Sequence, residues 1–233
     1  MTRLRCTFVL RRRGVSRESQ KWHDTYRTTE LVARRASSHR RKLERLGVFD
    51  LPRDARVLDL ACGSGEALHI LHHAGFTRLY GVDVTADEQL AREPWVEVRA
   101  GDASAIPYGD ATFDAVICMH SLHHLGGMEG IRRSLRESLR VLKPNGMLGL
   151  IDHYDSVQLR AAFWGLQKPW LTPTRGLRAF RRQHEEEWPY MYDYLDAWPG
   201  LRAMLDTLPC ESVLTHKGMF FFYWSGRKAA DGN

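Results

Sequence analysis

The stretch Val57-Leu58-Asp59-Leu60-Ala61-Cys62-Gly63-Ser64-Gly65 decides how we interpret the fold of this chain. A short apolar run followed directly by small residues is typical of a buried strand that ends in a tight turn. Residues 66–73 then have the apolar spacing of a helix. Open α/β sheets bind ligands beyond the carboxyl ends of such strands, so we expect the turn at 61–65 to belong to a binding site.

Strand-like segments recur after this unit, at residues 79–83, 95–99, 113–119 and 147–151. Helical spacing lies between them, for example at 131–142, and residues 143–146 are typical of a turn. Strands that alternate with helices predict βαβ units and a parallel sheet covered on both faces. Two last runs, near 211–216 and 219–224, predict an antiparallel hairpin. We therefore predict a doubly wound α/β fold.

The positive charge of the chain is concentrated at its N-terminus. The net charge is +6, and residues 1–50 contain 14 Lys/Arg against 5 Asp/Glu. Such a segment can be a targeting peptide, a polyanion-binding arm or a solvated tail, and the last is favoured. Residues 28–47 follow with the pattern of an amphipathic helix.

The four cysteines are far apart and form no C-x-x-C pair. Neither a zinc site nor a disulfide framework is therefore predicted, and a cytoplasmic location fits best. We find no apolar run near the roughly 20 residues of a membrane-spanning helix. The oligomeric state is not predicted.

The turn at 61–65 discriminates between two classes of cofactor. The G-x-G-x-x-G spacing that cradles a dinucleotide is absent. Asp59 precedes the turn, where it would repel a diphosphate but accept hydrogen bonds from an amino group. Small residues let a ligand approach the backbone closely. These features favour S-adenosylmethionine (SAM), which has an ammonium and a sulfonium group and no phosphate.

Four motifs in matching order over residues 56–152 resemble those of the class I SAM-dependent methyltransferases. The first is the quoted stretch, with Ala61 where Gly is usual. The others are Gly81-Val82-Asp83, Gly101-Asp102-Ala103 and Leu142-Lys143-Pro144-Asn145-Gly146-Met147-Leu148. The resemblance implies a Rossmann-like fold: a doubly wound, seven-stranded, mostly parallel sheet whose last strand is antiparallel, with an inserted helical cap.

The resemblance also implies roles for individual residues. Asp83 would bind the ribose hydroxyls, and Asp102 with the Ala103 backbone would bind the adenine amine. Expected cofactor-binding residues are Asp59, Ala61, Cys62, Gly63, Gly65, Asp83, Val84, Asp102, Ala103 and His120.

Methyl transfer requires mainly that a nucleophile is aligned and water is excluded. A base helps when the acceptor is a hydroxyl or an activated carbon. Histidine titrates near neutrality, and several follow the fourth and fifth predicted strands. We expect the base among His120, His124 and His153, with His123 a weaker candidate; a packing role is the alternative for His124. The histidine spacing supports no metal site, so none is predicted.

Aromatic side chains are dense in 153–200, where this family often inserts helices that cover the substrate. We expect substrate-binding roles for Trp22, Tyr26, Trp164, Trp188 and Tyr192. We divide the chain into a basic tail (1–20), an N-terminal helical cap (21–52), a SAM-binding core (53–152), an aromatic lid (153–200), and a C-terminal helix with hairpin (201–233).

The leading functional hypothesis is methyl transfer to a small apolar or aromatic metabolite, as in natural-product biosynthesis. The alternatives are an RNA or protein methyltransferase anchored by the basic N-terminus, and a SAM-binding protein without catalysis. An NAD-linked oxidoreductase is a further alternative. Nucleic acid is the less favoured partner, because Met119-His120-Ser121-Leu122 stands where base-amino methylating enzymes usually have Asn/Asp-Pro-Pro-Tyr/Phe.

Overall fold

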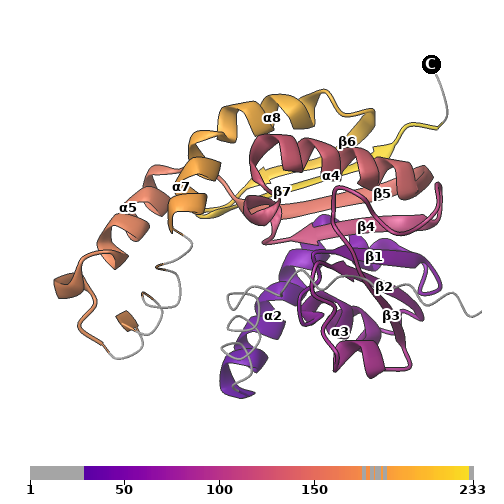
Figure 1. Cartoon of the computed structure of the whole chain (residues 1–233), viewed down its shortest axis with the longest axis horizontal. Helices are drawn as coiled ribbons and strands as arrows, with labels where there is room; N and C mark the ends of the chain where they lie inside the picture. The colour runs from indigo at the N-terminus through magenta and orange to yellow at the C-terminus, as the bar shows by residue number, and fades with distance from the viewer. Residues whose placement is uncertain (1–28, 175–176, 179–180, 182–184, 186–187, 231–233) are drawn as a thin grey trace, which may run out of the picture.

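The computed structural model describes residues 29–174, 177–178, 181, 185 and 188–230, with side chains from residue 37 on. One seven-stranded sheet has the order β3-β2-β1-β4-β5-β7-β6 (Figure 1). Strands β1 to β5 are parallel, and β7 is antiparallel to both β5 and β6. This confirms the predicted fold class. The strands are β1 (Arg56–Leu60), β2 (Arg78–Asp83), β3 (Val96–Ala100), β4 (Phe113–Met119), β5 (Leu142–His153), β6 (Cys210–Lys217) and β7 (Phe221–Lys228).

Helices cover both faces of the sheet (Figure 1). Helices α2 (Thr29–Leu46) and α3 (Glu66–His73) lie on one face, and α4 (Gly127–Val141), α7 (Trp188–Asp196) and α8 (Trp198–Asp206) lie on the other. Alternate residues of a strand therefore enter different cores: Val57 packs with α2 and α3, and Leu58 packs with α4 and α8. Because both faces are buried, the central strands are continuously apolar.

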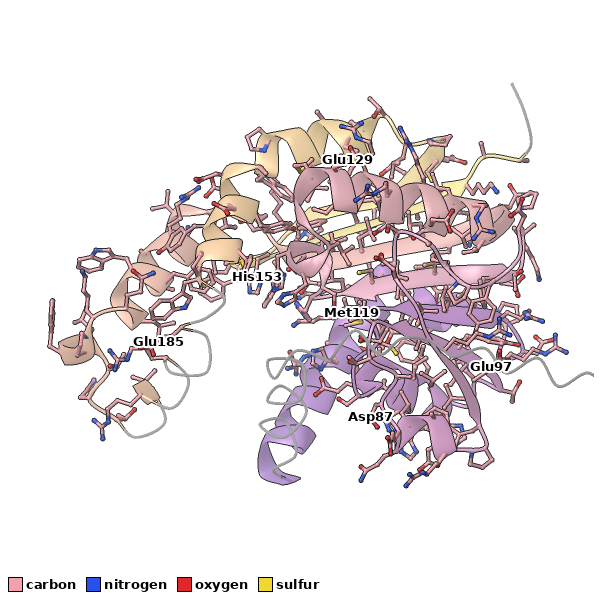
Figure 2. The ribbon with its side chains drawn as sticks, in the orientation of Figure 1. Asp87, Glu97, Met119, Glu129, His153 and Glu185 are labelled. Carbon is pink, nitrogen blue, oxygen red and sulfur yellow. The ribbon has the colours of Figure 1, made fainter. Side chains whose placement is uncertain are left out.

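The strand order reverses between β1 and β4, which are neighbours although β2 and β3 lie between them in sequence. The segments that follow β1, β2, β4 and β5 consequently meet at the carboxyl edge of the sheet. Figure 2 shows Met119 and His153 at this edge, at the ends of β4 and β5. The edge at the reversal point is where open α/β sheets bind their ligands.

Strand β5 differs from its prediction at its start. It begins at Leu142, not at 147, and residues 143–146 form an irregularity within it instead of a separate turn. The pairing with β4 shifts between Phe113 and Ala115, because Asn145 has a left-handed backbone with φ of 60°. Asn tolerates this conformation, as expected from the sequence.

Helix α5 (Val157–Leu166) and the short helix η4 (Pro169–Leu171) extend beyond the carboxyl edge of the sheet (Figure 1). The Ser156 side chain caps α5 by accepting a hydrogen bond from the Leu159 N–H at 3.2 Å. Short helices η1 (Val48–Asp50), η2 (Leu90–Arg92) and η3 (Leu122–His124) complete the described elements. Among these helices, none combines the length and apolar character that would let it cross a membrane.

Candidate functional site

The turn after β1 has a left-handed backbone at three positions, with φ of 57° at Ala61, 51° at Gly63 and 78° at Gly65. A Cβ on Gly65 would lie 2.5 Å from Leu90 Cδ2, so packing requires glycine there. A Cβ on Gly63 would meet no described atom within 4 Å. The backbone at Gly63 is therefore open to a ligand, and only its conformation calls for glycine.

Asp83, the last residue of β2, is fixed beside this turn. Its Oδ2 accepts a hydrogen bond from the Gly63 N–H at 2.9 Å, and its Oδ1 accepts from the Thr85 N–H at 3.0 Å and hydroxyl at 3.2 Å. Oδ2 accepts one hydrogen bond from the described residues and keeps a second lone pair, whereas Oδ1 can accept from a ligand only in place of the Thr85 hydroxyl. The geometry thus fits the predicted grip on two adjacent ribose hydroxyls, which stays a prediction.

Asp59, the penultimate residue of β1, has a buried carboxyl group. Burial, together with the negative charges of Asp83 and Glu66, raises its pKa to about 8. A ligand ammonium beside it would offset both effects, whereas a diphosphate would add to the repulsion. The residues of the turn therefore fit the amino-bearing, cationic SAM.

Cys62 has a packing role in the turn. Burial raises the pKa of its thiol far above the usual value, so the thiolate is not available. A Cβ on Gly81 would lie 2.8 Å from Cys62 Sγ, which explains the glycine in the middle of β2.

The predicted adenine-binding residues lie at the ends of neighbouring strands. Gly101 N–H donates to the Asp83 carbonyl at 2.8 Å, which joins the end of β3 to that of β2. Asp102 is exposed, and its Oδ1 accepts from the Ser104 N–H at 2.7 Å, which lowers its pKa. Ala103 is buried, and Val84 is 69% exposed. An exposed apolar side chain beside Asp83 fits contact with a planar base, and this role too stays a prediction.

Asp152, near the end of β5, is fully buried and organises two histidines. His123 Nδ1 lies 3.0 Å from both carboxylate oxygens, and the His153 N–H donates to Oδ1 at 2.7 Å. His153 Nδ1 is 3.3 Å from Oδ1 without the alignment of a hydrogen bond. Burial disfavours the charge of Asp152, but His123 and His153 outweigh it and hold its pKa well below the usual range. The sequence prediction missed Asp152, although an acid ending a buried strand is a signal.

His120 follows β4 with a left-handed φ of 57°, which is uncommon for a residue with a Cβ. Its N–H donates to the Ile151 carbonyl at 2.7 Å. Lys42 Nζ, from α2, lies 2.7 Å from His120 Nε2. Burial and the Lys42 charge hold the pKa of His120 well below its usual value. An ammonium group only donates, so Nε2 accepts and the imidazole is neutral.

Lys42 is a site residue that the sequence prediction missed. Burial lowers the pKa of Lys42 to about 8, although the negative charges of Asp152 and Glu66 act to raise it. In the sequence it is one of many basic residues on α2, and neither its spacing nor its neighbours distinguish it.

Phe221, the first residue of β7, joins these polar groups. Its ring centroid is 4.8 Å from that of His120, 4.6 Å from that of His153, and 4.1 Å from Lys42 Nζ. Polar groups from α2, β4 and β5 thus gather around one aromatic ring. We call Lys42, His120, His153 and Phe221 the edge cluster.

The other predicted histidine, His124, is exposed, and its ring centroid lies 4.0 Å from that of His123. His123, Asp152 and His153 have ligand atoms within 4.8 Å of one another, a set that could hold a metal ion. The hydrogen bonds to Asp152 already account for this proximity. The prediction of no metal stays a prediction.

The predicted lid residues lie around α5 and α7. Trp164 is 57% exposed, whereas Trp188 and Tyr192 are half-buried. The Tyr192 hydroxyl accepts from Gln167 Nε2 at 3.0 Å. Phe163 lies between this helix pair and the edge cluster, 6.4 Å from the Tyr192 ring and 6.2 Å from the His153 ring. Trp22, Tyr26 and the basic tail (1–20) lie outside the described residues.

The fold and the turn after β1 define a SAM-binding α/β domain, and comparison with known proteins agrees. Residues 58–150 match the family model described as a methyltransferase domain. A 2-phytyl-1,4-naphtoquinone methyltransferase from Thermosynechococcus vestitus is 32% identical over 169 residues, covering 66% of this chain and 68% of the relative. The chain belongs to the class I SAM-dependent methyltransferases, and SAM is its cofactor.

Two further similar proteins bear on the fold and the range of acceptors. A 27-O-demethylrifamycin SV methyltransferase from Amycolatopsis mediterranei is 30% identical over 142 residues, covering 56% of this chain and 48% of the relative. The structure of a 1,6-didemethyltoxoflavin-N1-methyltransferase from Burkholderia thailandensis, with bound S-adenosylhomocysteine, has a TM-score of 0.57 and 20% identity. The matched region covers 90% of this chain and 84% of the Burkholderia chain, and it shows that the two share a fold.

Proposed function

We propose that this methyltransferase acts on a hydroxyl group, or on a ring carbon that such a hydroxyl activates, of an apolar small molecule. The observation that carries the proposal is the imidazole of His153 beside the buried Asp152 at the carboxyl edge. Two relatives, a 2-phytyl-1,4-naphtoquinone methyltransferase and a 27-O-demethylrifamycin SV methyltransferase, are consistent with acceptors of this kind.

His153 is the residue that we assign as the base. Its side chain is 20% exposed, against 6% for His123, so it is the more accessible imidazole on Asp152. When it takes the hydroxyl proton, the imidazolium charge forms 3.3 Å from a carboxylate that water does not screen. His120 is less suited to this role, because its Nε2 already accepts from Lys42.

Bound SAM supplies a methyl group on a positively charged sulfur, so the protein needs to add only alignment, proton removal and exclusion of water.

The apolar part of the acceptor has a candidate place along α5. A hollow of about 490 Å³ there is lined by Ala161, Ala162, Gly165, Leu166, Leu171 and Leu177. Ligand pockets for small molecules are commonly this large and this apolar. Phe163, on the same helix, contacts the His153 ring. We assign 153–200 as the lid on this basis.

The test is formation of S-adenosylhomocysteine with a panel of phenols, naphthols, reduced 1,4-naphthoquinone, aliphatic alcohols and amines. We expect the wild type to use one or more of the hydroxyl compounds. His153→Gln should lower kcat at least a hundredfold, the usual contribution of a general base, with SAM affinity unchanged. His216→Gln, a change of an exposed histidine on β6, is the matched control. Turnover with amines alone would contradict the proposed acceptor, and an unchanged kcat in His153→Gln would contradict the proposed base.

A further inference from the structure

Lys42 is a cation of the edge cluster that the mechanism above does not use. Its Nζ has three N–H donors; one is directed to His120 Nε2, and the group lies over the face of Phe221. Neither partner carries a negative charge. The carboxylates that attract Lys42, Asp152 and Glu66, are themselves engaged, Asp152 with His123 and Glu66 with His39 at 3.1 Å. Among the described side chains, the ammonium thus has no carboxylate that is paired with it alone.

The position of Lys42 relative to the proposed base suggests what that anion is. Lys42 and His153 both lie against the ring of Phe221, at 4.1 Å from Nζ and 4.6 Å between ring centroids. A hydroxyl bound over this ring can give its proton to His153 while its oxygen stays near Lys42. The negative charge that remains on oxygen would then be stabilised by the ammonium, which is worth most where water is excluded.

We propose that Lys42 binds the ionised oxygen of the acceptor, so that the site selects acidic hydroxyls such as those of phenols, naphthols and hydroquinones. This rests on the proposed function, and it deepens it by naming the class of acceptor. An aliphatic alcohol is far less acidic and would not form a stable anion beside Lys42. An ionised phenol spreads its charge onto ring carbons, so one site can serve methylation at oxygen or at carbon.

The step balances in atoms and electrons. The acceptor O–H bond breaks, its proton moves to His153 and the electron pair stays on oxygen. The oxygen or a ring carbon then forms a bond to the methyl carbon while the S–C bond breaks and its electron pair stays on sulfur. A ring carbon that has received the methyl group releases its own proton to water, which returns the ring to an aromatic phenolate, and His153 passes its proton to water before the next turnover.

The experiment measures the ionisation of a bound probe and not turnover. The probe is 4-nitrophenol, whose phenolate is distinguished from the phenol by its absorption spectrum, bound to the S-adenosylhomocysteine complex. The titratable groups around Lys42 and its partner His120 are Asp152, Glu66, His39 and His153. We expect the pKa of the bound probe to fall by at least one unit relative to the free probe, a tenfold or greater preference for the anion.

Variants of α2 assign this shift to Lys42. In Lys42→Met the shift should disappear, and in Lys42→Arg most of it should remain. Arg45 is another cation of α2, and its guanidinium lies 5.4 Å from the ring of Tyr223 on β7. Arg45→Met should leave the shift unchanged. Calorimetric affinity for S-adenosylhomocysteine shows that each variant is folded.

Three results would overturn the proposal. These are a probe pKa in the wild type equal to that of the free probe, an equal shift in wild type and Lys42→Met, and binding of no phenol or naphthol at all. The first and third do not depend on any variant being folded. A shifted probe without methyl transfer to the oxygen or a ring carbon of any hydroxyl compound would contradict the proposed function and leave the role of Lys42 intact. Turnover of hydroxyl acceptors without the shift would contradict the role of Lys42 alone.

Discussion

The protonation state of Asp59 should differ between the cofactor-free and the cofactor-bound protein. Its carboxyl group is buried beside Asp83 and Glu66, which raises its pKa to about 8. A group that is neutral at pH 7 cannot attract an ammonium until it loses its proton. The ordinary pKa of an unfolded Asp is near 4, so the cofactor-free protein also loses stability as the pH rises from about 4 to about 8. Ionising Asp59 in the cofactor-free turn therefore costs free energy, and a bound cationic ligand would reduce that cost.

This gives a pH dependence with a defined sign. The ionised fraction of Asp59 falls tenfold per unit below pH 8, so SAM affinity should fall about tenfold between pH 7 and pH 6. Asp59→Asn should bind SAM more weakly at pH 7 and show a flatter dependence. Calorimetric titration at the two pH values measures both, and equal wild-type affinities would contradict the assignment.

Gly63 and Gly65 share a left-handed backbone but differ in their surroundings. An alanine at either position takes a conformation that costs about 1–2 kcal/mol. Gly65→Ala adds a clash with Leu90, whereas Gly63→Ala places its methyl group in open space. We expect Gly65→Ala to lower the free energy of unfolding more, and Gly63→Ala to weaken SAM binding more relative to its effect on stability. Chemical unfolding measures the stability and calorimetry measures SAM binding. Equal effects of the two substitutions on both quantities would contradict a backbone at Gly63 that is open to the cofactor.

At the scale of elements, α5 is proposed to hold the apolar part of the acceptor. Ala161 lines the hollow and is exposed, so Ala161→Phe should fill it at little cost in stability. We expect KM for bulky apolar acceptors to rise at least tenfold, while small phenols are affected little. Gln158→Phe, an exposed change on α5 outside the hollow, is the control. An unchanged KM for bulky acceptors would place their binding elsewhere.

The elements themselves were largely predictable, because both faces of the sheet are buried and local apolar patterns survive in the sequence. The strands β1, β2 and β4 and the helix α3 are found within a residue or so of their predicted bounds. The predicted start of strand β5 was wrong, because a turn-like sequence forms an irregular part of the strand with Asn145 at positive φ. Local residue preferences do not reveal how a neighbouring strand accommodates such a segment.

At the scale of the whole molecule, the topology assembles a site that no local pattern contains. The edge cluster combines α2, the ends of β4 and β5 and the start of β7, residues 42 to 221 of the chain. The motifs after β1, β2 and β3 were recognisable because each is contiguous. Lys42 and Asp152 were missed because their importance depends on contacts across the fold.

The central claim, that the carboxyl edge binds SAM through Asp83, has a direct measurement. It is the calorimetric Kd for SAM of the wild type, of Asp83→Asn and of the control Asp87→Asn, whose residue accepts bonds from Gln89 and Leu90 in the same loop. Loss of charge-assisted hydrogen bonds of about 1.5–3 kcal/mol each should weaken Asp83→Asn at least tenfold and leave the control within about twofold. Wild-type affinity in Asp83→Asn would contradict the account.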